Sequence, residues 1–284
     1  MIRPVRDSNL VVMYHYVRPE NSDGVTGLTP EKFGRQLDLV GKHYRFVTLE
    51  EYLAQHEDES GMALVTFDDA VSDQYDYAFP VLEAHDVPAV VFAPMRPFSE
   101  ETDRWSTQHL LHALAQHLGW AEFERRVDAI LGPLDLDQAA VDRIYHYEVP
   151  AKRRMKYTLA FAVKQPQVRE VLCEINRSVG LDAADWFVSA AQLREIQAAG
   201  HAIGGHGFDH VPYDTLTPKQ QAADMHRAQA VMTEVCGAMQ RALAYPYGSS
   251  APETEGIAKG CGYSMCFDTA GRVDAMNLER ELGS

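Results

Sequence analysis

The sequence lacks the features of a disulfide-bonded or membrane-spanning protein. Only four of its 284 residues are cysteines, and no two of them have the CxxC spacing of a zinc or redox motif. We therefore expect reduced, mostly buried thiols rather than a disulfide framework. No stretch of the chain approaches the roughly 20 apolar residues that a membrane-spanning helix requires, so we predict no integral membrane segment.

Positive charge is also scarce. The chain has 26 lysines and arginines against 41 aspartates and glutamates, which gives a formal net charge of −15. A nucleic-acid-binding protein has a basic surface, and an anionic membrane attracts basic segments. We therefore predict that neither nucleic acid nor an anionic membrane surface is a partner. Solubility alone accounts for a surplus of acidic residues.

The amino-terminal segment "MIRPVRDSNLVVMYHYV" lacks two features of a secretory signal peptide. It has no long apolar core and no small-residue cleavage site. Together with the absence of a candidate membrane span, this leads us to expect a cytoplasmic protein.

The sequence does contain an alternation of β-rich and helical segments. Helix starts are indicated by hydroxyl residues that precede proline, as at Thr29 and Thr217, or that precede Glu or Gln by three positions, as at Thr48 and Ser189. β-rich segments occupy residues 9–17, 45–49, 62–67, 88–94, 201–206, 242–248 and 262–271. Such alternation predicts an α/β fold with a parallel sheet or barrel, in which functional sites lie at the carboxyl ends of the strands.

A helical, charged and strand-poor stretch interrupts this alternation at about residues 105–185. We interpret it as an insertion within a single domain that spans residues 1–284. It would form either a lid or pocket wall, or a plain helical layer that only packs.

Reactive side chains follow several of the predicted strands. They are His15, the pair Asp68 and Asp69 in "ALVTFDDA", His206 and His210 in "GGHGFDH", and Tyr247 in "YPYG". Each has an ordinary structural explanation when taken alone, because an aspartate at a strand end often forms a turn or caps a helix. Their combination is more specific than any single member.

Two histidines and one carboxylate form the ligand set of many catalytic zinc and iron sites. His206 and His210 are four residues apart, so both can face one point if the backbone turns between them. Neighbouring residues of an extended segment point in opposite directions. We therefore expect one of Asp68 and Asp69 to bind a metal and the other to act as a base toward an attacking water.

Three ordered motifs resemble those of the polysaccharide deacetylase superfamily, also called NodB-homology or carbohydrate esterase 4. "TFDDA", "HGFDH" and "YPYG" are similar to that family's TFDDG, H[ST]xxH and PPYG motifs. The opening "VVMYHYVRP" resembles bacterial members that begin with a YH motif. The matching segments are spread over residues 11–248. The resemblance implies a distorted (β/α) barrel and metal-dependent hydrolysis of an N-acyl group on an amino sugar.

The resemblance also implies a role for each matching residue. Asp68 matches the catalytic base, and Asp69, His206 and His210 match the metal ligands, with Zn²⁺ as the expected ion. Tyr247 matches the residue whose backbone N–H helps to hold the oxyanion, a form of electrostatic stabilisation that is often the largest catalytic contribution.

The sequence departs from the family pattern at three internal positions. Ala70 replaces a glycine and Gly207 replaces a hydroxyl residue, and we expect both changes to be tolerated. Ala244 stands where many members have an arginine that orients the base. The candidates to replace that arginine are Arg241, Arg272 and Arg280.

The family's terminal LxxH motif, which supplies the general-acid histidine in many members, is absent, since the sequence ends "NLERELGS". His15 and His109 are our candidates for the acid. A structural role explains either histidine equally well.

These features lead us to expect a deacylase that removes an acetyl or formyl group from a nucleotide- or lipid-linked amino sugar in surface-glycan biosynthesis. One alternative is an amidohydrolase that acts on a substrate other than a sugar. Another is a catalytically inactive barrel that binds a glycan or a protein. The presence of both a base and a full ligand set argues against the inactive barrel.

Overall fold

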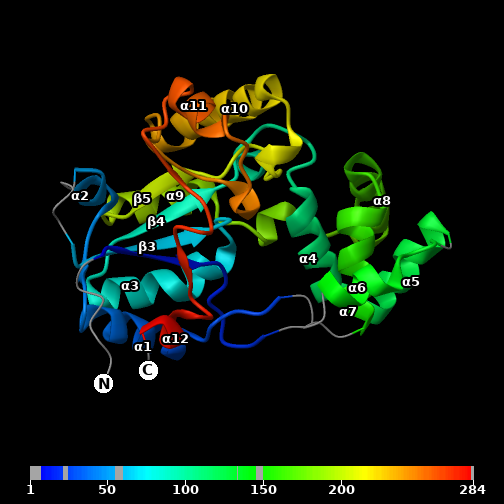
Figure 1. Ribbon diagram of the computed structural model, residues 1–284, viewed down its shortest axis with the longest axis horizontal. Coiled ribbons are helices and arrows are strands. Elements are labelled where there is room, and N and C mark those ends of the chain that lie inside the picture. Colours follow the sequence, from blue (N-terminus) through cyan, green and yellow to red (C-terminus); the bar gives the residue numbers. More distant parts are fainter. Residues whose placement is uncertain (1–7, 22–24, 55–59, 133, 145–149, 283–284) are drawn as a thin grey trace. The chain divides into compact units, whose positions relative to one another are not determined.

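A computed structural model describes residues 8–21, 25–54, 60–132, 134–144 and 150–282 (Figure 1). The chain divides into two compact units. The first, called the barrel unit here, comprises Met1–Glu20, Gly27–Arg104 and Ala184–Ser284. The second, called the helical unit, comprises Asn21–Thr26 and Trp105–Ala183.

The barrel unit is built on a parallel sheet. Its strands are β1 (Leu10–Tyr14), β2 (Arg45–Phe46), β3 (Met62–Asp68), β4 (Ala89–Ala93), β5 (Ala202–Gly205), β6 (Ala242–Ala244), β7 (Met265–Phe267) and β8 (Val273–Asp274). Their order is β7-β6-β5-β4-β3-β1-β8, and β2 pairs with β3. This parallel half-barrel with surrounding helices confirms the predicted distorted (β/α) barrel. The short strand β8 was not predicted.

Helices surround the sheet. They are α1 (Pro30–Gly41), α2 (Leu49–Ala54), the π-helix η1 (Gln74–Ala78), α3 (Phe79–His85), η2 (Arg96–Phe98), η4 (Ala183–Asp185), α9 (Ala190–Ala198), η5 (Tyr213–Thr215), α10 (Pro218–Cys236), η6 (Pro246–Gly248), α11 (Thr254–Gly260) and α12 (Leu278–Leu282). The predicted caps are present: the Thr29 hydroxyl accepts from the Lys32 N–H at 3.3 Å, and Ser189 and Thr217 each form a capping box.

Residues of the sheet alternate between two apolar clusters. On β3, Ala63, Val65 and Phe67 pack with α1, α3, α9 and α10 on the outer face. Leu64 packs on the inner face with Phe92 of β4 and Ala244 of β6. Parallel strands are typically buried on both faces in this way. By the same alternation, Asp68 belongs to the inner face that also holds Ala244.

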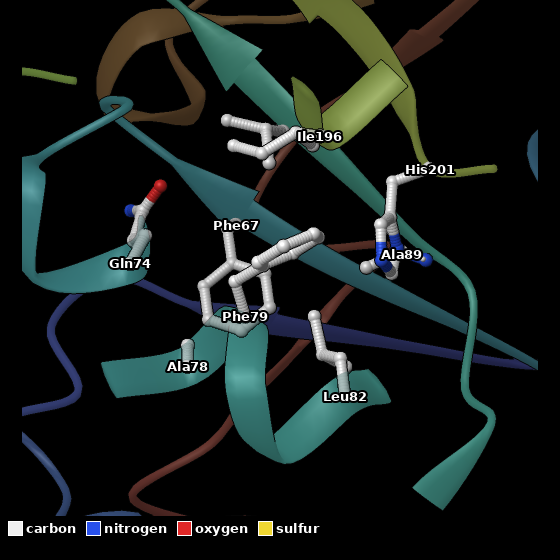
Figure 2. Close-up of a pocket in the computed structure, with 9 residues that line it drawn as sticks. Phe67, Gln74, Ala78, Phe79, Leu82, Ala89, Ile196 and His201 are labelled. Atoms are coloured by element: carbon white, nitrogen blue, oxygen red, sulfur yellow. Dashed lines mark hydrogen bonds between the residues drawn. The ribbon is translucent and has the colours of Figure 1, made fainter. Parts of the chain in front are cut away.

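A small cavity lies between the outer face of the sheet and the η1–α3 segment (Figure 2). Its lining is mostly apolar, with Phe67, Phe79 and Ile196 among its members. His201 at its edge is fully engaged, since its Nδ1 accepts the Ala89 N–H at 3.0 Å and its Nε2 lies 3.0 Å from Glu83 Oε1. We therefore regard the cavity as a packing feature of the core.

The helical unit contains α4 (Thr107–Leu118), α5 (Trp120–Leu131), α6 (Gln138–Ile144), α7 (Pro150–Tyr157), the π-helix η3 (Thr158–Ala162) and α8 (Gln165–Val179). Within α5 the buried rings of Trp120 and Phe123 have centroids 5.9 Å apart, and Arg154 of α7 pairs with Glu124 and Asp128 of α5. Whether this unit acts as a lid, as a pocket wall or only as a layer stays a prediction.

Two expectations from composition can be compared with the structure. The four cysteines all lie within the described residues and are free thiols. Among the described helices, none is both long and apolar enough to cross a bilayer.

Candidate active site

The two neighbouring aspartates at the end of β3 have different surroundings. Asp68 is the last residue of the strand and is in register with Phe92 of β4. Asp69 leaves the strand with a φ of +82°. This left-handed turn of the backbone sends the two carboxylates to different partners, although both are buried.

Asp68 forms a two-point ion pair with Arg272. The guanidinium donates from Nη1 to Oδ1 at 2.6 Å and from Nη2 to Oδ2 at 2.8 Å. The two side chains are only 1% and 3% exposed. Burial alone would raise the pKa of Asp68, but the charge and hydrogen bonds of Arg272 hold that pKa below its usual value. Asp68 is therefore ionised at neutral pH.

Of the three candidates to replace the arginine expected at position 244, Arg272 is the one that pairs with Asp68. It lies immediately before β8, and its guanidinium reaches the inner face of the sheet. The other two candidates are directed elsewhere: Arg241 donates to Ser264 Oγ at 3.3 Å and Arg280 to Glu281 Oε1 at 3.3 Å.

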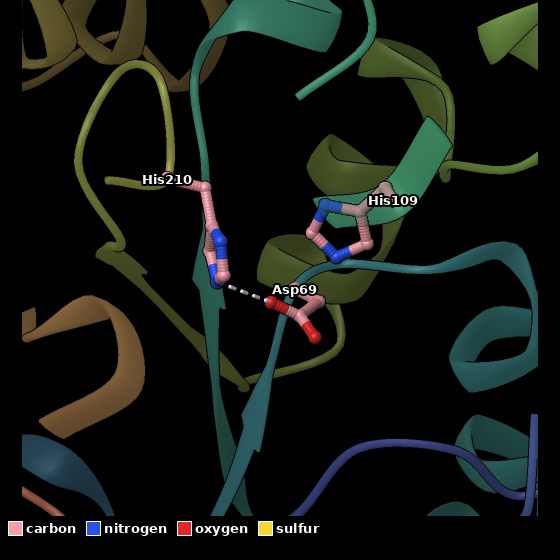
Figure 3. A group of neighbouring side chains, drawn as sticks. All are labelled: Asp69, His109 and His210. Atoms are coloured by element: carbon pink, nitrogen blue, oxygen red, sulfur yellow. Dashed lines mark ion pairs between the residues drawn. The ribbon is translucent and has the colours of Figure 1, made fainter. Parts of the chain in front are cut away.

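Asp69 faces the two histidines of the HGFDH segment. His206 directly follows β5, and its Nε2 lies 3.5 Å from Asp69 Oδ1. The Nε2 atom of His210 lies 3.1 Å from the same oxygen, and the carboxylate and imidazole face each other in Figure 3. All three side chains are buried.

The chemistry of these three groups fits a cation. His206 Nδ1 donates to the Ala244 carbonyl at 2.8 Å, so its Nε2 has no proton when the ring is neutral. Burial lowers the pKa of His206 to about 4, which keeps the ring neutral at pH 7. A lone pair and a carboxylate oxygen therefore face each other at 3.5 Å. Ligands of a tetrahedral zinc ion with bonds of about 2.0–2.1 Å are separated by about 3.3 Å. Asp69, His206 and His210 are the residues that would hold such an ion.

Two further predicted site residues lie at this edge of the sheet. His15 follows β1, and Gln74 joins its carbonyl to that of Asp68. Tyr247 lies in η6 with a φ of +61°, its side chain is half exposed, and its ring centroid is 4.9 Å from that of His210. Both positions agree with the predicted edge.

His109 belongs to α4 of the helical unit. Its Nδ1 lies 2.5 Å from the Oγ of Ser106, the N-cap residue of that helix. This contact is the kind that a structural role at the start of α4 would require. Its assignment as a general acid stays a prediction.

Backbone strain is concentrated at the site. Five of the described non-glycine residues have a positive φ, and four of them are Asp69, Ala70, His210 and Tyr247. Such conformations persist where the surrounding structure imposes them, and they cluster at functional sites. The φ of +53° at Ala70 also explains why a glycine suits this position of the motif.

Sequence reasoning missed one residue that supports the strand ends. Gln74, the first residue of η1, is buried and donates from Nε2 to the carbonyls of Asp68 at 2.5 Å and His15 at 2.8 Å. It thereby ties the ends of β1 and β3 together. The single sequence gives no signal for this role, because a glutamine at the start of a helix is ordinary.

Comparisons with known proteins agree with the motifs. Residues 145–266 match the family model "Polysaccharide deacetylase", a segment that contains His206, His210 and Tyr247 but not the aspartate pair. The Bacillus subtilis protein YxkH, which is named as a polysaccharide deacetylase, is 25% identical over 107 residues. That match covers 38% of this chain and 37% of YxkH.

Solved structures share the fold over nearly the whole chain. IcaB from Ammonifex degensii has a TM-score of 0.56 and 21% identity, and the match covers 95% of this chain and 86% of IcaB. The Streptococcus pyogenes deacetylase PplD, solved with acetate, has a TM-score of 0.56 and 15% identity, and the match covers 99% and 100% of the two chains. The matched segment is similar in sequence to the polysaccharide deacetylase family that the motifs resemble, and the solved deacetylase structures share its fold.

Proposed function

We propose that this protein is a metal-dependent hydrolase that removes an acetyl or formyl group from the nitrogen of an amino sugar. The observation that carries the proposal is the division of labour between the two aspartates. Asp68 is ionised and fixed by Arg272, while Asp69 faces two buried imidazoles. An amide hydrolase needs both a base and a site that stabilises developing negative charge. The similarity of residues 145–266 to the polysaccharide deacetylases favours an N-acylated amino sugar as the substrate of this protein.

We assign Asp68 as the general base. Its depressed pKa keeps the carboxylate ionised, and Arg272 holds both of its oxygens in place. Each oxygen retains a lone pair that can accept a proton from an attacking water. General-base catalysis of this kind typically contributes 10²–10⁴-fold in rate.

We assign Asp69, His206 and His210 as ligands of a divalent cation, with Zn²⁺ as the proposed ion. When bound there, the cation would polarise the acyl carbonyl and lower the pKa of a water molecule to about 7. The neutral state of His206 supports this assignment, since only the unprotonated imidazole is a ligand.

We assign the backbone N–H of Tyr247 as a donor to the oxyanion. The partial exposure of Tyr247 beside His210 leaves its aromatic ring accessible to a sugar ring. His15 is the candidate acid within the barrel unit, because it follows β1 and Gln74 joins its carbonyl to that of Asp68. His109 is the candidate from the helical unit.

The test is to measure zinc content and acyl release for the wild type and for Asp68→Asn. Substrates are N-acetyl and N-formyl amino-sugar oligomers and nucleotide-linked N-acyl amino sugars, with acetate or formate quantified. We expect Asp68→Asn to retain zinc and lose at least 100-fold in kcat. Asp86→Asn is the matched control, because Asp86 is exposed at the end of α3 and asparagine tolerates its φ of +53°. Full activity of Asp68→Asn on a substrate that the wild type hydrolyses would disprove the mechanism.

A further inference from the structure

The segment between the two histidines is held from one side by the turn after β4. The carbonyl of Gly207 accepts from the Met95 N–H at 3.0 Å, and the carbonyl of Phe208 accepts from the Arg96 N–H at 3.0 Å. These bonds hold the two carbonyl groups of the segment. Its backbone N–H groups also need acceptors, because buried N–H groups are rarely left without one.

A single carboxylate on α10 supplies the acceptors for these donors. Asp224 Oδ2 accepts from the Phe208 N–H at 2.9 Å, and Oδ1 accepts from the Asp209 N–H at 3.1 Å. The hydroxyl of Tyr213 donates to Oδ2 at 3.0 Å. The segment between His206 and His210 is therefore bonded on both sides by groups outside it.

Gly207 makes this arrangement possible. A Cβ atom at this position would lie 3.0 Å from Asp224 Oδ2 and 3.1 Å from the Tyr213 hydroxyl oxygen. Its φ of +72° is also unfavourable for any other residue. The hydroxyl residue that usually follows the first histidine of the motif would therefore displace the Asp224 carboxylate.

We propose that Asp224, together with Tyr213 and Gly207, positions the two histidine ligands by fixing the backbone between them. This inference rests on the proposed role of His206 and His210 in binding a cation. Asp224 is a positioning residue, since it acts only through the N–H groups of Phe208 and Asp209. Groups that orient metal ligands typically contribute 10–100-fold to metal affinity.

Asp224→Asn is the most informative substitution. An amide has one acceptor oxygen, so its NH₂ group would face one of the two backbone N–H donors. Gln229→Leu is the matched control, because Gln229 lies on the same helix and its side chain also makes two bonds to backbone, to the carbonyl and N–H of Gln240. Both substitutions remove buried hydrogen bonds, but only Asp224→Asn changes the segment between the histidines.

The experiment is calorimetric titration of Zn²⁺ into metal-stripped proteins, at a temperature well below the melting temperature of each variant. We expect Asp224→Asn to bind Zn²⁺ 10–100-fold more weakly than the wild type, and Gln229→Leu to bind it with unchanged affinity despite lower stability. Gly207→Ser should weaken binding as well, although it restores the usual motif. Tyr213→Phe removes one of the three bonds and should weaken binding several-fold, which keeps the test available if Asp224→Asn does not fold.

The outcomes separate this inference from the proposed function. If the wild type binds no Zn²⁺, the proposed metal centre is wrong. If the wild type binds Zn²⁺ and Asp224→Asn or Tyr213→Phe binds it equally well, the positioning role is wrong while the metal centre stands. An equal loss of affinity in Gln229→Leu would also overturn the positioning role, because it would reflect general destabilisation.

Discussion

Replacing Arg272 by leucine should lower the free energy of unfolding of this protein and move the acid limb of its kcat/KM to higher pH. The guanidinium is 1% exposed and makes two bonds to a carboxylate that is 3% exposed. Removing one partner of such a buried pair leaves an uncompensated charge and typically lowers the free energy of unfolding by roughly 3–5 kcal/mol. That loss is a large share of the roughly 5–15 kcal/mol by which a domain is stable.

The stability part of this prediction is measured by urea unfolding of a double-mutant cycle. Asp68→Asn combined with Arg272→Leu removes both charges, so the double variant should be more stable than Arg272→Leu alone. If the two losses are simply additive, the ion pair contributes no coupling energy and the argument from burial fails.

The catalytic part is measured by the pH dependence of acyl release. Arg272 lowers the pKa of Asp68, whereas burial raises it. The stabilisation that ionised Asp68 provides is present above its unfolded pKa and is lost as pH falls through its lower folded pKa. Without Arg272, burial dominates and the pKa rises, so the acid limb of kcat/KM should move to higher pH.

Arg154→Leu is the control for this shift. Arg154 pairs with Glu124 at 2.7 Å and with Asp128 at 3.0 Å in the helical unit, so its loss removes ion pairs without touching Asp68. We expect a less stable protein with an unchanged acid limb. Arg272→Lys, which keeps the charge but not the two-point geometry, should shift the limb less than Arg272→Leu does. An unchanged acid limb in Arg272→Leu would refute the role of Arg272 in holding Asp68 ionised.

Three shorter predictions concern neighbouring residues. Zn²⁺ at about 100 times its Kd should stabilise the wild type by about 2.7 kcal/mol in thermal unfolding and leave the stability of Asp69→Asn unchanged. An equal stabilisation of both proteins would show that the ion binds at a site without Asp69. Ala70→Gly should change stability by less than about 1 kcal/mol, because relief of the left-handed backbone is offset by a lost buried methyl group and a more flexible unfolded chain. Gln74→Leu removes the hydrogen bonds that Gln74 donates to the carbonyls of Asp68 and His15, which should lower the free energy of unfolding by roughly 1–3 kcal/mol and lower kcat. An unchanged kcat would show that Gln74 does not support the active site.

Most of the fold could be predicted from the sequence, because the signals are local. The hydroxyl caps at Thr29, Ser189 and Thr217 depend on residues three positions away, and the structure shows each of these bonds. The seven β-rich segments likewise correspond to β1 to β7. The strand β8 escaped prediction because a two-residue strand has no periodicity to detect.

The shared edge of the site was also predictable. In a parallel sheet the carboxyl ends of neighbouring strands meet, so side chains that follow β3, β5 and β6 converge however far apart they are in the sequence. What the sequence could not provide were the contacts that hold these side chains. Asp68 and Arg272 are 204 residues apart, and Gln74 and Asp224 sit on helices with no motif around them.

The position of Arg272 shows that a buried carboxylate predicts a nearby cation, although the position of that cation in the sequence can differ from the one usual in the family. Ionised Asp68 on the inner face requires a positive charge within reach, and a residue at position 244 is only one way to supply it. Here Ala244 packs with Phe92 on that face and contributes its carbonyl to His206, while the guanidinium arrives from the segment before β8. The two aspartates therefore have separate sources of compensation, an arginine for Asp68 and the proposed cation for Asp69. It follows that removing the metal should leave Asp68 ionised, and that losing Arg272 should impair the base before it impairs the ligands.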